Sequence, residues 1–230
     1  YAADNNIQSQ GTTMATSTTV EFKNLDLGYY LVDSTLGTIC SLDTTNPDVT
    51  IKEKNAEPTN VKTVEEDSTG KYGSTNDADI GQTVNFKSTI TAQAGAENYV
   101  FEDTMSAGLT YNKDAKVYTD ETMTTELAAA YYTVNNNPGN GKTFTITFKQ
   151  EYLNTITKET KLYVKYSAVV NDAAVVGGDG NSNESVLKYG DDNNTKSTPT
   201  SKTTTYTWKL DVFKYTTKDG TQTPLADAKF

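Results

Sequence analysis

Three polar residues fall on strand faces that are otherwise apolar, and their chemical types complement one another. In "NVKTVEE", Lys62 alternates with Val64. In "NYVFEDTM", Asp103 shares a face with Phe101, and in "NESVLKYG", Asn183 lies on the apolar face. Because successive side chains of a strand point to opposite faces, all three are predicted to point into a core.

These three residue types can form an isopeptide bond without a cofactor. Burial disfavours the charged forms, so the pKa of Lys62 should fall and the pKa of Asp103 should rise. The neutral amine can then attack the side-chain carbonyl carbon of Asn183 while Asp103 moves protons and ammonia leaves. Folding supplies the proximity, which for well-oriented groups is worth roughly 7–11 kcal/mol of the barrier.

Simpler interpretations stay open at this point. Lys62 at a strand end can pack its stem against the core and keep its amine in solvent. A buried ion pair between Lys62 and Asp103, beside an amide, would need no covalent bond. Asn181 lies on the same face as Asn183 by parity and is an alternative acyl donor.

The composition removes most other kinds of catalytic site. The chain has 230 residues, a net charge of −10, one Cys and no His. Without His, Ser-His-Asp and Cys-His triads and His-based zinc sites are excluded. Cys40 alone cannot form an intrachain disulfide, and it is predicted to be a small buried hydrophobe. An acidic chain without a basic stripe argues against nucleic acid and anionic membranes as partners.

No metal or cofactor is expected. The segment "DGNSNE" places Asp179, Asn181 and Asn183 at a spacing similar to that of a calcium-binding EF-hand loop. Glu184 stands where that loop needs glycine, and Gly190 where it needs glutamate. A tight loop without bound calcium is therefore predicted.

Short strands and turn signals predict an all-β protein built from β-sandwich domains. Thr- and Tyr-rich stretches alternate with Gly, Asn and Asp, as is typical of such folds. Strands are predicted at 20–34, 47–55, 60–66, 81–92, 98–104, 116–120, 132–136, 142–153, 161–171 and 183–190, with a helical turn in "TTELAAAYY".

Three units are predicted along the chain. Residues 1–57 read as the C-terminal part of one domain, 58–203 as a central domain and 204–230 as the start of a third. Pro58 cannot join a central ladder and marks the first linker, and the polar "DDNNTKSTPTSKT" marks the second. The chain contains no signal peptide, transmembrane run or sorting signal and is expected to be part of a longer protein.

The central motifs resemble a known family. "PTNVKTVEEDSTGKYG", "NYVFEDTMSAGLTY" and "GNSNESVLKYG" are similar to the lysine, acid and asparagine segments of Gram-positive pilin middle domains (the fimbrial isopeptide-forming D2 type), in the family's order. The resemblance implies tandem Ig-like sandwiches of the CnaA and CnaB types. It also implies Lys62 as nucleophile, Asp103 as proton-shuttling acid and Asn183 as acyl donor.

The flanking segments resemble the same family. "TWKLDVFKYTTKDGTQTPLADAKF" looks like the start of a CnaB-type domain, with Lys214 similar to its bond-forming lysine. "FKNLDLGYYLVDS" looks like an E-box-type strand, with Asp33 in place of the usual Glu. "VTIKEKN" is similar in placement to the pilin motif Tyr-Pro-Lys-Asn but keeps only Lys54 and Asn55. The resemblance implies that sortase joins Lys54 to the next subunit, and that Asn55 closes a bond within the N-terminal domain.

The function implied is that of a structural shaft subunit of a sortase-assembled pilus, secreted and anchored to the cell wall. Its partners would be other pilin subunits, joined covalently, and host or surface ligands. It would not be an enzyme beyond its single-turnover crosslinking. One alternative is an ancillary pilin or wall-anchored adhesin. A second is an extracellular glycosidase using carboxylate pairs, either Glu65 with Glu66 or Asp191 with Asp192.

Overall fold

Strands make up nearly all of the regular structure. The computed structural model describes residues 7–12, 20–32, 38–51, 56–190 and 195–225. Within these ranges the only helical elements are α1 (Gln150–Leu153) and a 3-10 turn at Ala129–Tyr131. The chain divides into two compact units, residues 1–54 and 55–230. No helix in the described part of the chain is long and apolar enough to cross a membrane.

The described part of the first unit forms an antiparallel hairpin. Strand β1 (Gly28–Val32) pairs with β2 (Thr38–Leu42), which places Leu31 opposite Ile39. The strand predicted at 20–34 is therefore shorter than expected. The prediction of a strand at 47–55 is wrong for the described residues 47–51. These residues pair with no described strand, so no ladder satisfies their backbone groups. Cys40, predicted to be buried, is only half-buried.

One sheet of the second unit has seven strands. Their order is β10-β11-β7-β13-β15-β5, and β14 also pairs with β13. Their bounds are Thr75–Asp77 for β5, Val100–Met105 for β7, Tyr132–Asn135 for β10, Phe144–Phe148 for β11, Asn181–Tyr189 for β13, Lys196–Ser197 for β14 and Ser201–Tyr206 for β15.

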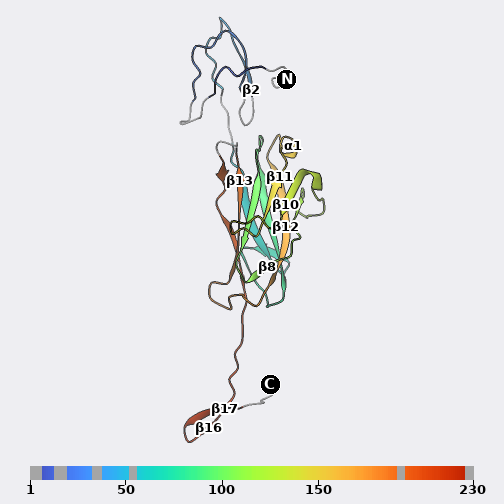
Figure 1. Ribbon diagram of the computed structural model, residues 1–230, viewed down its shortest axis with the longest axis vertical. Coiled ribbons are helices and arrows are strands. Elements are labelled where there is room, and N and C mark those ends of the chain that lie inside the picture. Colours follow the sequence, from blue (N-terminus) through green and yellow to red (C-terminus); the bar gives the residue numbers. More distant parts are fainter. Residues whose placement is uncertain (1–6, 13–19, 33–37, 52–55, 191–194, 226–230) are drawn as a thin grey trace. The chain divides into compact units, whose positions relative to one another are not determined.

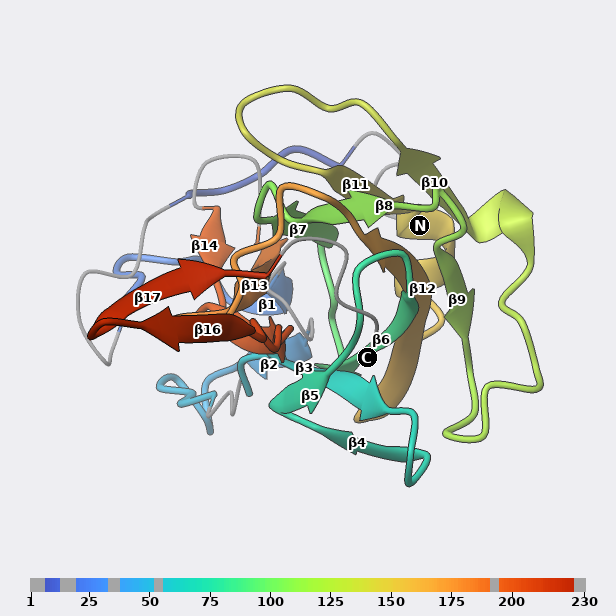
Figure 2. The ribbon, with the colours of Figure 1, turned by 90° about the horizontal axis from the view of Figure 1, so that it is seen from below.

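The other sheet has six strands in the order β4-β3-β6-β12-β8, and β9 also pairs with β12. Their bounds are Thr59–Glu66 for β3, Lys71–Gly73 for β4, Thr83–Ala92 for β6, Leu109–Tyr111 for β8, Lys116–Tyr118 for β9 and Thr160–Val170 for β12. The strands run lengthwise in Figure 1, and Figure 2 shows the same unit seen from below.

Alternation builds the core between the two sheets. In β6 every second residue is buried, including Phe86, Ser88 and Ile90. Phe101, Phe144, Leu162, Val164 and Leu187 are likewise fully buried. The prediction of an all-β sandwich is confirmed.

The polar segment predicted as a linker contributes to the sandwich. Strand β15 pairs with β13 on one side and, in parallel, with β5 on the other. Its buried residues are Thr203 and Thr205, at most 1% exposed. Because these residues are polar, the hydropathy pattern did not reveal the strand. β15 crosses the predicted boundary at 203/204, so Asn183 does not lie on the last strand of the sandwich.

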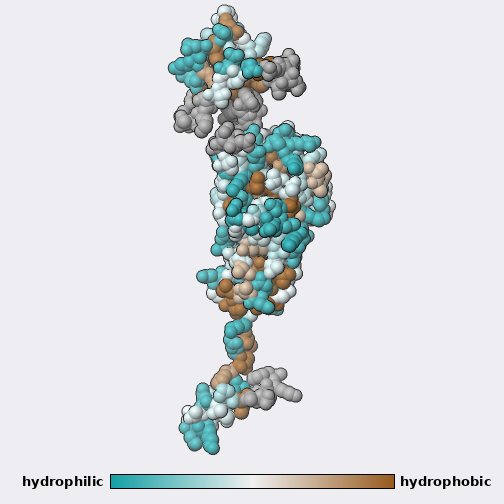
Figure 3. Space-filling view, in the orientation of Figure 1, coloured by the Kyte–Doolittle hydropathy of each residue, from teal (hydrophilic) through white to brown (hydrophobic). Residues whose placement is uncertain are grey.

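The chain after the sandwich forms a second hairpin, β16 (Tyr215–Lys218) with β17 (Thr221–Pro224). Asp219 and Gly220 take positive φ values of 51° and 80° at its tip, as a tight turn of this type requires. Residues 208–214 form no strand. Apolar side chains of this segment are exposed, and brown residues are visible here in Figure 3.

Candidate functional site

Lys62 lies inside the sandwich, with its amine directed at two side chains of the opposite sheet. It is 3% exposed, between Asn60 and Val64 on the buried face of β3. Its Nζ donates a hydrogen bond to Asn183 Oδ1 at 2.7 Å and forms a short contact with Asp103 Oδ2. The side chains of Lys62 and Asp103 are completely buried. The snorkelling interpretation of Lys62 is therefore wrong.

Two adjacent strands position the acid and the amide. β7 pairs with β13 so that Asp103 lies opposite Ser185, and Asn183 lies opposite Met105. Asp103 and Asn183 therefore sit diagonally on one inner face, near enough to share a partner. Lys62 reaches them from the other sheet. A bond between Lys62 and Asn183 would tie the two layers of the sandwich together.

The surroundings favour the uncharged forms of the pair. Burial lowers the pKa of Lys62, and the nearby Asp103 only partly opposes this effect. Burial likewise raises the pKa of Asp103, partly opposed by Lys62. The rings of Phe86 and Tyr166 lie 5.8 and 5.2 Å from the lysine Nζ. The arrangement favours a neutral, nucleophilic amine next to a protonated acid.

Tyr166 completes the site and was missed in the sequence. It lies on β12 and is 1% exposed. Its hydroxyl donates to Asp103 Oδ2 at 2.5 Å, and Asn183 Nδ2 donates to the same hydroxyl oxygen at 3.3 Å. Alternation places Tyr166 with Leu162 and Val164, so a phenol on an apolar face was the available signal.

Asn181 takes no part in this cluster. Its Oδ1 accepts from the Val175 N–H at 2.9 Å, and its Nδ2 donates to the carbonyl oxygens of Val175 and Thr205, both at 3.2 Å. The amide is thus fully engaged with the backbone, and Asn183 is the one that contacts Lys62. No group of three or more acidic, Cys or His side chains among the described residues could hold a metal ion.

The remaining predicted site residues are Asp33, Lys54, Asn55 and Lys214. Asp33, Lys54 and Asn55 lie outside the described residues. Lys214 is exposed and directly precedes β16, and its carbonyl oxygen accepts from the Leu225 N–H at 3.0 Å. Because residues 208–214 form no strand, this segment gives Lys214 no inner strand face.

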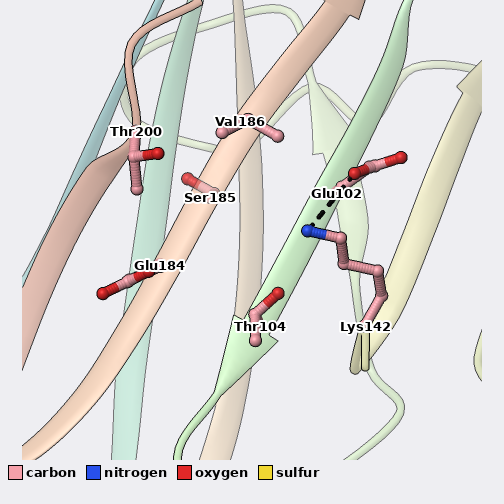
Figure 4. Close-up of a pocket in the computed structure, with 7 residues that line it drawn as sticks. All are labelled: Glu102, Thr104, Lys142, Glu184, Ser185, Val186 and Thr200. Carbon is pink, nitrogen blue, oxygen red and sulfur yellow. Dashed lines mark ion pairs between the residues drawn. The ribbon is translucent and has the colours of Figure 1, made fainter. Parts of the chain in front are cut away.

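Of the two carboxylate pairs expected for a glycosidase, the pair that the structure describes is not placed across a cleft. Glu65 and Glu66 are consecutive on β3, so their side chains leave opposite faces, and Asp191 and Asp192 lie outside the described residues. A small surface pocket of the seven-stranded sheet contains Glu102 and Glu184 (Figure 4).

Lysines neutralise both carboxylates of that pocket. Glu102 forms ion pairs with Lys142 at 3.4 Å and Lys188 at 2.7 Å, and Glu184 with Lys202 at 3.7 Å. Both carboxylates of this pocket are therefore paired with lysines.

Comparisons with known proteins identify the fold. No protein-family model and no curated protein matches the chain. Among solved structures, the 35 kDa C-terminal fragment of the major pilin GBS80 of Streptococcus agalactiae is 21% identical, with a TM-score of 0.50 over 66% of this chain and 57% of that chain. The sandwich has a pilin-type fold.

Two further structures show the same similarity. The full-length major pilin RrgB of Streptococcus pneumoniae is 21% identical, with a TM-score of 0.50 over 67% of this chain and 27% of that chain. BcpA, the major pilin subunit of Bacillus cereus, is 15% identical, with a TM-score of 0.50 over 77% of this chain and 51% of that chain. The chain therefore spans between 27% and 57% of these pilins.

Proposed function

We propose that this chain is part of a structural shaft subunit of a sortase-assembled pilus, and that its sandwich is locked by a self-formed isopeptide bond between Lys62 and Asn183. The observation that carries the proposal is the buried contact of 2.7 Å between Lys62 Nζ and Asn183 Oδ1, with the Asp103 carboxyl on the same amine. The pilin-type fold supports the assignment to a pilus but does not by itself define a function.

The bond would form in two stages. Lys62 Nζ, uncharged next to protonated Asp103, attacks Asn183 Cγ and gives a tetrahedral intermediate. The Asp103 carboxyl supplies the proton that the amide nitrogen of Asn183 gains before it departs as ammonia, and the carboxylate left behind takes a proton from the attacking nitrogen. One C–N bond forms and one breaks, so neither metal nor oxidant is needed. The dry core holds the reacting groups together for as long as the domain is folded.

The crosslink would resist mechanical unfolding of the sandwich. It closes a loop whose ends are 121 residues apart in the sequence. A crosslink around a loop of this size stabilises the folded state by about 5 kcal/mol in the chain-entropy model developed for disulfides. Under tension the larger effect is kinetic, because forced unfolding follows the unfolding rate. Both effects suit a subunit that transmits force.

Intact mass tests the bond. The purified wild-type protein should be lighter than its calculated mass by one ammonia, and peptide sequencing should join Lys62 to Asn183. Asp103→Ala should restore the full mass. Asn181→Ala is the matched control, because it removes an amide on the same strand face that does not contact Lys62, and it should keep the mass loss. A folded wild type of full calculated mass would overturn the proposed bond.

The covalent partners proposed are other pilin subunits, with Lys54 as the residue that sortase joins to its neighbour at the cell wall. Lys54→Ala in the producing cell should abolish the ladder of polymers on a denaturing gel, and Lys214→Ala should leave it intact. Surface display without a ladder in the wild type would favour the ancillary pilin or adhesin. Bonds through Asn55 with Asp33, or through Lys214, stay predictions, and so do host ligands.

A further inference from the structure

The leaving nitrogen of Asn183 has its own hydrogen-bond partner, distinct from the group beside the attacking amine. Lys62 contacts the amide on its oxygen, Oδ1. On the other side, Asn183 Nδ2 donates to the Tyr166 hydroxyl oxygen at 3.3 Å. The amide is therefore held between Lys62 from β3 and Tyr166 from β12, two strands of the same sheet.

Tyr166 also contacts the acid. Its hydroxyl donates to Asp103 Oδ2 at 2.5 Å, the same oxygen that Lys62 contacts. The phenol thus bridges the carboxyl and the nitrogen that must depart. No hydrogen bond joins Asp103 to Asn183 Nδ2 in the structure, whereas Tyr166 reaches both groups.

We propose that Tyr166 is a catalytic residue of the crosslinking reaction, and that it relays a proton from the Asp103 carboxyl to the departing nitrogen of Asn183. This inference rests on the proposed Lys62–Asn183 bond and names a further residue for it.

The chemistry of the amide makes the relay directional. Before attack, the nitrogen lone pair is conjugated with the carbonyl, so Nδ2 can only donate to Tyr166. After Lys62 adds to Cγ, the carbon is tetrahedral and Nδ2 has a free lone pair. The Tyr166 O–H then turns to the nitrogen and gives up its proton, while the protonated Asp103 carboxyl re-protonates the phenol oxygen, and the carboxylate left behind takes a proton from Lys62 Nζ. Tyr166 ends as it began, and ammonia leaves.

The surroundings of Tyr166 keep its hydroxyl protonated before and after each proton transfer. Burial, together with the charge that Asp103 can carry, raises its pKa well above the usual value for tyrosine. The phenol therefore stays protonated unless it receives one proton as it gives another. Phe86 stacks on its ring at 5.4 Å and Phe144 meets it edge-on at 4.8 Å, and these contacts fix the ring in the core.

The test measures the rate of crosslinking from a defined time of synthesis. Protein made by cell-free translation is sampled for intact mass, and the loss of one ammonia is followed in wild type, Tyr166→Phe and Tyr111→Phe. Tyr111 belongs to the same aromatic cluster, 6.3 Å from Tyr166 between ring centres, but its hydroxyl accepts from the Ala115 N–H. Tyr111 is half-buried, and its variant is the control for loss of a phenol from this cluster that does not contact Asp103 or Asn183.

Tyr166→Phe should crosslink at least roughly 10²-fold more slowly than wild type, as expected for loss of a positioned proton donor, and Tyr111→Phe should match wild type. Equal rates for Tyr166→Phe and wild type would overturn the relay while leaving the bond itself in place. Equal slowing in both variants would also overturn it, since packing would then be the cause. A wild type that never loses ammonia would overturn the proposed bond instead.

A second measurement covers the case in which Tyr166→Phe does not fold, as judged by circular dichroism. Incorporation of 3-fluorotyrosine at position 166 keeps the ring, the hydroxyl and its contacts, but makes the phenol more acidic. The crosslinking rate should differ several-fold from that of protein carrying 3-fluorotyrosine at position 111. Identical rates for the two labelled proteins would contradict a proton transfer through Tyr166.

Discussion

Two lysines with similar sequence surroundings have opposite environments in the structure. Lys62 in "NVKTV" and Lys214 in "LDVFK" each alternate with apolar residues. Lys62 is 3% exposed and contacts an acid and an amide of the opposite sheet. Lys214 is exposed next to a two-stranded hairpin. The same local pattern thus gives a candidate nucleophile in one place and a solvated side chain in the other.

The difference shows what burial of a lysine requires. β3 lies in a six-stranded sheet that faces a second sheet, and Phe86 of the neighbouring β6 and Leu187 of the opposite sheet are fully buried. In the segment that precedes β16, Leu210 is 86% and Phe213 62% exposed. Two strands alone bury too little apolar surface to form a core. Alternation of apolar residues therefore predicts which face of a strand points inward. That face is buried only where a second sheet packs against it.

The largest effect should come from removing each lysine in turn. Lys62→Ala should restore the full calculated mass and lower the free energy of unfolding of the sandwich by at least about 5 kcal/mol, because the proposed crosslink cannot form and Asp103 is left buried without its partner. Lys214→Ala should keep the loss of one ammonia from its calculated mass and the free energy of unfolding of the wild type. Urea unfolding together with intact mass measures both, and similar losses in the two variants would break the comparison.

A smaller effect is expected from two leucines in the same two regions. Leu187→Ala should lower the free energy of unfolding by about 2–5 kcal/mol, since it leaves a cavity at a fully buried position. Leu210→Ala should change it by less than about 0.5 kcal/mol, because that side chain is already in water. Thermal unfolding of the purified protein gives both values. A large loss for Leu210→Ala would mean that the segment 208–225 packs against a core in solution.

The smallest effect concerns pH. Lys62→Met leaves Asp103 buried without a cation, so its pKa should stay above the ordinary value of 3.8. Between that value and the raised pKa the folded state binds more protons than the unfolded state. Stability should therefore be fully present below about pH 3.8 and fall as pH rises, by at most about 1.4 kcal/mol per pH unit.

The control for this pH dependence removes the titrating group. Lys62→Met combined with Asp103→Asn should lose the slope, and Lys214→Met should have the wild-type pH profile. Urea midpoints measured at a series of pH values compare the three variants with the wild type. A slope of the opposite sign in Lys62→Met would show that Asp103 is stabilised as a carboxylate.

Much of the site could be predicted because its residues break a strong pattern. Lys62, Asp103 and Asn183 are polar residues at positions where strand alternation demands apolar ones, and the structure brings all three together. Tyr166 was missed because a tyrosine departs from an apolar face much less than a charged or amide side chain does. β15 was missed because its buried side chains are threonines, whose burial depends on hydrogen-bonded neighbours such as β13 and not on hydropathy.

The sequence by itself determined that this is an all-β protein without histidine chemistry, and which strand faces point inward, because both follow from composition and from a period of two along each strand. Only the tertiary structure decided which inward faces meet. It chose Asn183 over Asn181, placed Tyr166 between the acid and the amide, and left Lys214 in water. These outcomes depend on strand order and on the packing of two sheets, which join residues more than a hundred positions apart and have no local signal in the chain.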